Sequence, residues 1–191
     1  MIKLCIGGVK ITAEFSFFVF MAMMFLCGEN SLITDYLICV LIHECAHGIA
    51  LCAFGGSLGE ILFTACGIRL IPARERILSY CKEIFVLSAG PLSNLLLFFM
   101  LHSANTHSSF ALINLGTAVF NLLPYSLLDG GCILIVISQL FNCEKLMRYF
   151  LTTAQIFLFA LSLICTVTLG LAFLPLTIFT LSYGIYDMKQ K

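Results

Sequence analysis

The stretch LIHECAHGIA, residues 41–50, places two histidines and one glutamate inside a run of apolar residues. His43 and His47 are four residues apart, so on a helix both imidazoles project from one face, about one turn apart. Glu44 lies beside the first of them. This is the H-E-x-x-H pattern, in which two histidines bind zinc and the glutamate acts as general base toward water. The pattern predicts half of a metal site, with a chance match or an interhelical polar cluster as the alternatives.

The composition around this stretch is that of a membrane protein. Of the 191 residues, 61% are hydrophobic and 10% are charged, whereas a soluble domain is about half apolar and about one quarter charged. A charge near the middle of a membrane span costs at least ~2.5 kcal/mol on insertion scales, so ionisable residues there are expected to be functional and paired. Ten basic residues balance ten acidic ones. This balance leaves no basic surplus for nucleic acid, and we expect no nucleic-acid partner.

The ten cysteines are spread along the chain without C-x-x-C pairs. Most lie in apolar runs, where a free thiol packs as a small hydrophobic group, so we expect reduced packing residues rather than a disulfide framework. Cys45 lies between the two histidines in sequence but projects roughly 200° away from each of them on a helix. It is therefore not expected to be a ligand.

Apolar segments of sufficient length predict six membrane-spanning helices. They lie at about residues 11–27, 32–53, 80–101, 108–126, 148–166 and 169–187. The apolar residues 131–141 are expected to return along or just inside the cytoplasmic boundary. Between the second and third spans, the strand-like pieces EILFT and GIRLI, around Ala65, Cys66 and Gly67, predict a small cytoplasmic β-hairpin. The expected fold is an all-α polytopic membrane protein with this hairpin, forming a single domain over residues 1–191.

The positive-inside rule gives the orientation, because basic residues concentrate in short cytoplasmic loops. With six spans and both termini cytoplasmic, all ten basic residues fall on one side of the membrane. They are Lys3, Lys10, Arg69, Arg74, Arg76, Lys82, Lys145, Arg148, Lys189 and Lys191.

Two histidines leave a catalytic zinc one short of its usual three protein ligands. Glu14 and Asp35 lie near predicted span ends, where an ordinary interfacial carboxylate is the better explanation. Asp129 lies instead in NLLPYSLLDGG, residues 121–131. Pro124 interrupts a helix there, and the two glycines after Asp129 allow irregular backbone. Such backbone at membrane depth must be buried in protein or line a wet cavity, which favours a site, although an ordinary turn residue explains these letters equally well.

Three motifs together resemble the site-2 protease family of intramembrane zinc metalloproteases. They are HECAH at residues 43–47, AGPLSN at residues 89–94 and NLLPYSLLDGG at residues 121–131. The last matches the family pattern N-x-x-P-x-x-x-x-D-G residue for residue. The resemblance covers about residues 10–187, and the short first span is most similar to the bacterial sporulation branch, which processes a membrane-tethered sigma-factor precursor. The chain departs from that branch in lacking its C-terminal CBS domain, which leaves that substrate and nucleotide-sensitive regulation unsupported.

The resemblance implies a role for each motif residue. His43, His47 and Asp129 would bind zinc, Glu44 would activate water, and Asn121 would hydrogen-bond the substrate backbone near the scissile peptide. From the residues alone, Asn121 is better explained as an interhelical hydrogen-bonding residue. The small and kinking residues of AGPLSN allow close helix packing, so this motif is expected to support the zinc helix rather than to take part in catalysis.

The predicted function is hydrolysis of a peptide bond in or next to a transmembrane segment of a membrane-tethered protein, such as a sigma-factor precursor or another regulatory protein. The alternatives are a non-catalytic, client-binding homologue and a metal transporter. The expected surroundings are the lipid bilayer of a bacterial cell membrane or of the membrane around a forespore. A membrane regulatory partner and a homo-oligomer are both compatible with the sequence.

Overall fold

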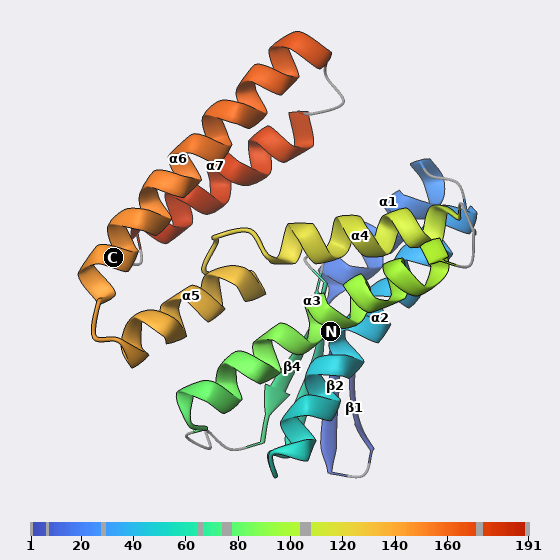
Figure 1. The fold of residues 1–191 in the computed structure, drawn as a ribbon. Helices are drawn as coiled ribbons and strands as arrows, with labels where there is room; N and C mark the ends of the chain where they lie inside the picture. Colours follow the sequence, from blue (N-terminus) through green and yellow to red (C-terminus); the bar gives the residue numbers. More distant parts are fainter. Residues whose placement is uncertain are drawn as a thin grey trace. The chain divides into compact units, whose positions relative to one another are not determined.

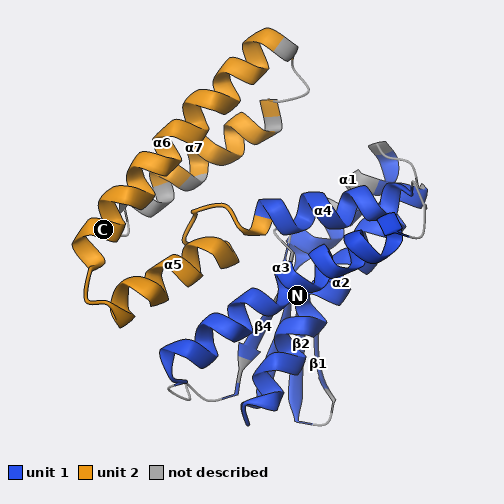
Figure 2. Ribbon diagram, in the orientation of Figure 1, with its two compact units in different colours: residues 1–120 blue, residues 121–191 orange. Residues whose placement is uncertain are grey.

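The computed structural model describes residues 2–6, 8–27, 30–64, 67–73, 78–103, 108–170 and 174–189. The chain divides into two compact units, residues 1–120 and 121–191 (Figure 2). Arg74, Arg76, Lys191, Ala65 and Cys66 lie outside the described residues. The single domain expected over the whole chain stays a prediction.

The first unit combines a small sheet with four helices (Figure 1). The strands are β1 Ile2–Ile6, β2 Val9–Ala13, β3 Leu58–Thr64 and β4 Gly67–Pro72, in the spatial order β1-β2-β3-β4. Each of the pairs β1/β2 and β3/β4 is antiparallel, and β2 runs parallel to β3. The helices are α1 Phe15–Cys27, α2 Asn30–Ala53, α3 Tyr80–Ser103 and α4 Ser109–Asn121.

The predicted hairpin between the second and third spans is confirmed as β3 and β4, but it belongs to a four-stranded sheet that the sequence reading did not anticipate. The first predicted span, 11–27, is wrong at its start, because residues 11–13 belong to β2 and α1 begins at Phe15. The physical reason is pairing with a distant strand, because residues 10–13 lie opposite residues 60–63 of β3 in a parallel register. The Thr12 hydroxyl donates to the carboxylate of Glu60 on β3, so these residues pair in a sheet rather than extend a helix.

α2 is the central helix of the first unit. It packs against α3 along one side and against β4 near its C-terminal end. Gly48 allows the second contact, because a Cβ there would lie 3.1 Å from the side chain of Leu70 and 3.4 Å from that of Leu58. The residue after His47 is therefore in contact with the sheet, which ties the helix that carries the histidines to the strands.

Three helices of the described residues are long and apolar enough to cross a membrane. They comprise Ser31–Ala53, Tyr80–Ser103 and Glu144–Thr168. Two shorter apolar helices, Ser109–Asn121 and Asp129–Leu140, correspond to the predicted fourth span and to the apolar segment after it. The fourth predicted span, 108–126, is too long, since α4 ends at Asn121. These helices support a membrane protein, while the count of six crossings and the sidedness of the termini stay predictions.

The second unit contains α5 Asp129–Leu140, α6 Glu144–Leu169 and α7 Leu174–Lys189. α6 and α7 pack together through hydroxyl groups: Ser162 Oγ lies 3.1 Å from Thr180 Oγ1, and Thr166 Oγ1 lies 2.7 Å from Thr177 Oγ1. Small hydroxyl residues of this kind are typical of helix interfaces in membranes, where they allow close approach and hydrogen-bond across it.

Candidate metal centre

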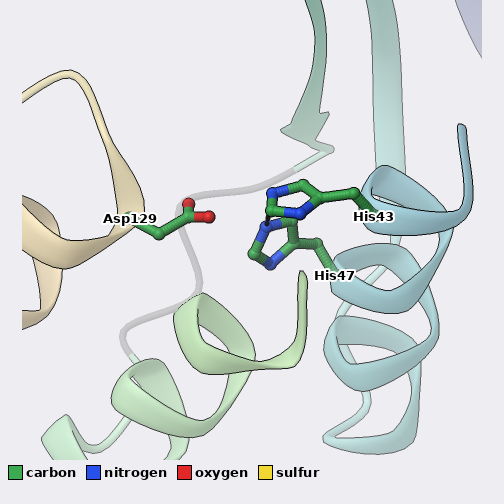
Figure 3. Close-up of side chains that lie close together, drawn as sticks. All are labelled: His43, His47 and Asp129. Carbon is green, nitrogen blue, oxygen red and sulfur yellow. Dashed lines mark hydrogen bonds between the residues drawn. The ribbon is translucent and has the colours of Figure 1, made fainter. Parts of the chain in front are cut away.

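The two histidines of the H-E-x-x-H motif lie one turn apart on α2, as their spacing predicts. Their Nε2 atoms are 3.2 Å apart. His43 is buried, with 4% of its surface exposed, and His47 is partly buried. Figure 3 draws both imidazoles on α2, together with the Asp129 side chain that the third motif supplies. The helix therefore aims two potential ligand atoms at one point.

Both imidazoles are held through their other nitrogen by α3. His47 Nδ1 lies 2.7 Å from the carbonyl oxygen of Val86, which can only accept, so this nitrogen carries the proton. His43 Nδ1 lies 3.1 Å from Oδ1 of Asn94, a side chain that is fully buried. With both protons on Nδ1, both Nε2 atoms present lone pairs to each other. Two lone pairs at this separation repel, and a cation between them removes the repulsion.

The separation of the two nitrogens fits zinc. Two nitrogens at the usual Zn–N distance of about 2.05 Å, with a tetrahedral angle between them, are about 3.3 Å apart, and the observed value is 3.2 Å. Metal-binding histidines also usually donate their second N–H to a carbonyl or carboxylate oxygen, which fixes the tautomer and the ring orientation. The contacts of His47 with Val86 O and of His43 with Asn94 Oδ1 have this arrangement. The histidine pair is thus prepared for a metal on the Nε2 side.

Gly90, from the AGPLSN motif on α3, allows both imidazoles to lie directly against this helix. A Cβ at this position would lie 2.7 Å from Nε2 of His43 and closer still to Nε2 of His47. Real Cβ atoms essentially never approach other heavy atoms within 3.0 Å. Together with the Asn94 contact, this places the motif directly against the helix that carries the two histidines.

The remaining residues of the first motif lie as expected from helical geometry. Cys45 is exposed, so its side chain does not share the buried side of α2 with His43. Glu44 is partly buried and adjacent in sequence to His43. Its role as general base stays a prediction.

Asp129 lies in the second unit, in the first turn of α5. An acidic side chain is favourable at this position, because the helix N-terminus carries a partial positive charge. The residue before it, Leu128, has extended backbone with φ −108° and ψ 156°. Asn121 is the last residue of α4. The irregular segment 122–128 therefore begins after one motif residue and ends immediately before another.

The glycines after Asp129 are required by close packing of this segment onto α5. A Cβ on Gly130 would collide with the carbonyl group of Leu122, and a Cβ on Gly131 would collide with that of Tyr125. Both obstacles are backbone atoms, which cannot rotate away as a side chain can. The Gly-Gly pair thus lets the irregular backbone lie directly on the first turn of the helix that carries Asp129.

The irregular segment also keeps its carbonyl groups hydrogen-bonded. Pro124 O accepts from Nε2 of Gln155 on α6 at 2.9 Å, and Ser126 O accepts from the thiol of Cys132 on α5 at 3.2 Å. Tyr125 O accepts from the Leu128 amide at 2.9 Å. Non-helical backbone in a membrane protein requires such partners, because no water in the hydrocarbon region replaces them. Three carbonyl groups of segment 122–128 are thus hydrogen-bonded within the second unit.

Several of these supporting residues were missed in the sequence. Asn94 was noted only as part of the AGPLSN motif, and Gln155 was not singled out. Their signal was available, since isolated amides in apolar helices are costly unless they are paired. The partners of Asn94 and Gln155, however, lie in other parts of the chain and do not follow from helical spacing.

Comparison with known proteins gives a match through structure alone. No protein-family model and no curated protein matches the sequence. Among solved structures, the chain is similar to a site-2 protease from Methanocaldococcus jannaschii, with a TM-score of 0.63 and 19% sequence identity over 97% of this chain and 94% of that one. At this identity the likeness concerns the fold. The resemblance drawn from the three motifs is thus confirmed at that level: the chain has the fold of the Methanocaldococcus jannaschii site-2 protease.

Proposed function

We propose that this protein is an intramembrane zinc metalloprotease that cuts a membrane-tethered protein in or next to a transmembrane segment. The observation that carries the proposal is the pair of Nε2 atoms 3.2 Å apart on α2, with each Nδ1 hydrogen-bonded to α3. The fold of a site-2 protease supports it.

His43, His47 and Asp129 are the proposed zinc ligands. Each offers one ligand atom, an imidazole nitrogen or a carboxylate oxygen, and three such ligands with one open position are typical of catalytic zinc. When bound there, zinc lowers the pKa of water toward about 7 and polarises a peptide carbonyl.

Glu44 and Asn121 carry the remaining chemistry in this proposal. The Glu44 carboxylate accepts the proton of the attacking water and later returns it to the leaving amine. The Asn121 amide donates to the substrate backbone, where negative charge develops on the carbonyl oxygen. An intact substrate helix hides its carbonyls in its own i to i−4 hydrogen bonds, so the segment that is cut must first unwind.

The histidines lie in the C-terminal half of α2, so we expect water to reach the proposed site from that end of the helix. His47 is six residues before the end of α2 at Ala53, which corresponds to about 9 Å at 1.5 Å per residue. The sheet follows directly after that end of the helix. We assign this side to the cytoplasm from the distribution of basic residues, with both termini there. The proposed substrate is a regulatory protein tethered to a bacterial membrane, of which a sigma-factor precursor is one example.

The test is cleavage of a membrane-tethered reporter protein coexpressed with the full chain. Glu44→Gln should lower cleavage at least about 100-fold, because general-base catalysis contributes 10²–10⁴-fold, while the zinc content remains that of the wild type. The matched control is Glu144→Gln, which changes an exposed glutamate at the start of α6 and should leave cleavage unchanged. Equal cleavage by the wild type and Glu44→Gln, or wild-type protein without zinc, would contradict the proposal.

A further inference from the structure

A chain of buried hydrogen bonds connects α4 to the metal centre through Cys39 of α2. The chain begins on α4 at Asn114, whose Nδ2 donates to the carbonyl oxygen of Phe110 at 2.8 Å. A carbonyl accepts only, so the amide orientation of Asn114 is determined and its Oδ1 faces Cys39 Sγ at 3.4 Å. Thr117 Oγ1 lies at the same distance from the sulfur. Cys39 and Asn114 are both completely buried.

The direction of every bond in this chain follows from the first. Because Asn114 Oδ1 can only accept, the Cys39 thiol donates toward α4, and its sulfur is left to accept from Nδ2 of Asn94 at 2.9 Å. Donation to the Thr117 hydroxyl instead would have the same consequence for the sulfur. Asn94 Oδ1 then faces His43 Nδ1 at 3.1 Å and accepts its proton. The chain ends with a lone pair on His43 Nε2.

We propose that Cys39 is a positioning residue of the metal centre: its thiol donates to α4 and accepts from Asn94, and thereby holds His43 in the tautomer that presents Nε2 to the metal. This inference rests on the proposed function. With the Asn94 amide reversed, its NH₂ group would donate to His43 Nδ1, the proton would move to Nε2, and the metal-binding lone pair would be lost.

Packing alone does not explain this arrangement. A buried free cysteine usually behaves as a small hydrophobic group. Here two fully buried amides, Asn94 and Asn114, face the sulfur of Cys39 from two different helices. Each would need another partner if the sulfur were replaced by an apolar group, because an unsatisfied buried amide costs about 1–3 kcal/mol.

The test compares Cys39→Ser with Cys39→Ala in the full chain purified in detergent. The two new side chains are almost equal in size, but only serine can both donate and accept. The dissociation constant for zinc is measured by competition with a chelator, and the visible spectrum of the Co²⁺-loaded protein reports ligand geometry. Cys39→Ala should weaken zinc binding about tenfold, at the lower end of the 10–100-fold effect of residues that orient metal ligands, and should change the cobalt spectrum. Cys39→Ser should restore most of the affinity and the wild-type spectrum.

The matched control is Cys45→Ala, which removes an exposed thiol from the same helix and should change neither measurement. Equal zinc affinity and an unchanged cobalt spectrum in Cys39→Ala would overturn the inference and leave the proposed function intact. Equal losses in Cys39→Ala and Cys39→Ser would also overturn it, because size rather than hydrogen bonding would then be responsible. Wild-type protein that binds neither metal would overturn the proposed function and, with it, this inference.

Discussion

The two motif regions proposed to supply metal ligands are built in opposite ways. On α2 the backbone is a regular helix, and the side chains are oriented by neighbouring groups. Both imidazoles are held by groups on α3, and Gly90 leaves space beside them. Before Asp129 the backbone itself is irregular. It is held in place through its main-chain carbonyl groups, which contact glycines or accept hydrogen bonds. A helix supplies ligand spacing without cost but needs a neighbour to orient the ligands. A broken segment can place a carboxylate anywhere, but each freed carbonyl needs its own partner.

The largest effect is expected on the histidine side of this comparison, from Gly90→Ala. The added methyl group collides with both Nε2 atoms, so we expect zinc affinity to fall at least about 100-fold, beyond the range for residues that only orient ligands. Alanine favours a helix by roughly 0.5–1 kcal/mol over glycine, so any loss of zinc should not be due to weaker helix formation. Gly116→Ala on α4, where a Cβ meets nothing within 4 Å, is the matched control. Zinc binding by Gly90→Ala equal to that of this control would show that the space beside the histidines is not needed.

On the carboxylate side, Gly131→Ala should act on stability. Its Cβ collides with the Tyr125 carbonyl and with the neighbouring backbone, and overpacking of this kind costs about 1–3 kcal/mol. The midpoint of thermal unfolding in detergent should therefore fall. Gly184→Ala on α7 has open space around the new methyl group and should leave the midpoint unchanged or raise it. If both variants unfold at the same temperature, the close packing of segment 122–128 onto α5 is not as described.

The smallest effect is expected from Gln155→Leu, which removes the hydrogen bond to Pro124 O. Such a bond contributes about 1 kcal/mol in water-soluble proteins and about 0.6 kcal/mol between membrane helices, so the unfolding midpoint should fall slightly. Gln139→Leu changes an exposed glutamine on α5 and serves as the control. A decrease in zinc affinity in Gln155→Leu but not in Gln139→Leu would show that the hydrogen bond to Pro124 O also helps to position Asp129, the proposed ligand that follows segment 122–128.

The parts of the fold that depend on local sequence were predictable. The spacing of His43 and His47 gave their shared face, and the strand-like pieces at residues 60–71 gave the hairpin. The last residues of β2, 11–13, were assigned to the next helix because only Glu14 separates them from the apolar run of α1, and their pairing with β3 is not visible in the local sequence. The residues that orient the histidines were missed for a related reason. Asn94 and Cys39 are 55 residues apart, and no local pattern links them.

The parallel pairing of β2 with β3 has a consequence for how deep the histidines lie. The chain leaves the sheet at Ala13, opposite Phe63, forms α1 and α2, and re-enters it at Leu58 on the adjacent strand. The helical excursion therefore leaves from one end of the β2/β3 pair and returns to the other end. Gly48 also packs on the sheet through Leu58 and Leu70. Contact with the sheet therefore fixes the C-terminal part of α2, including His47, relative to the strands. In bilayers of different thickness, we expect the histidines to keep a constant height above the sheet, measured by the protein rather than by the lipid.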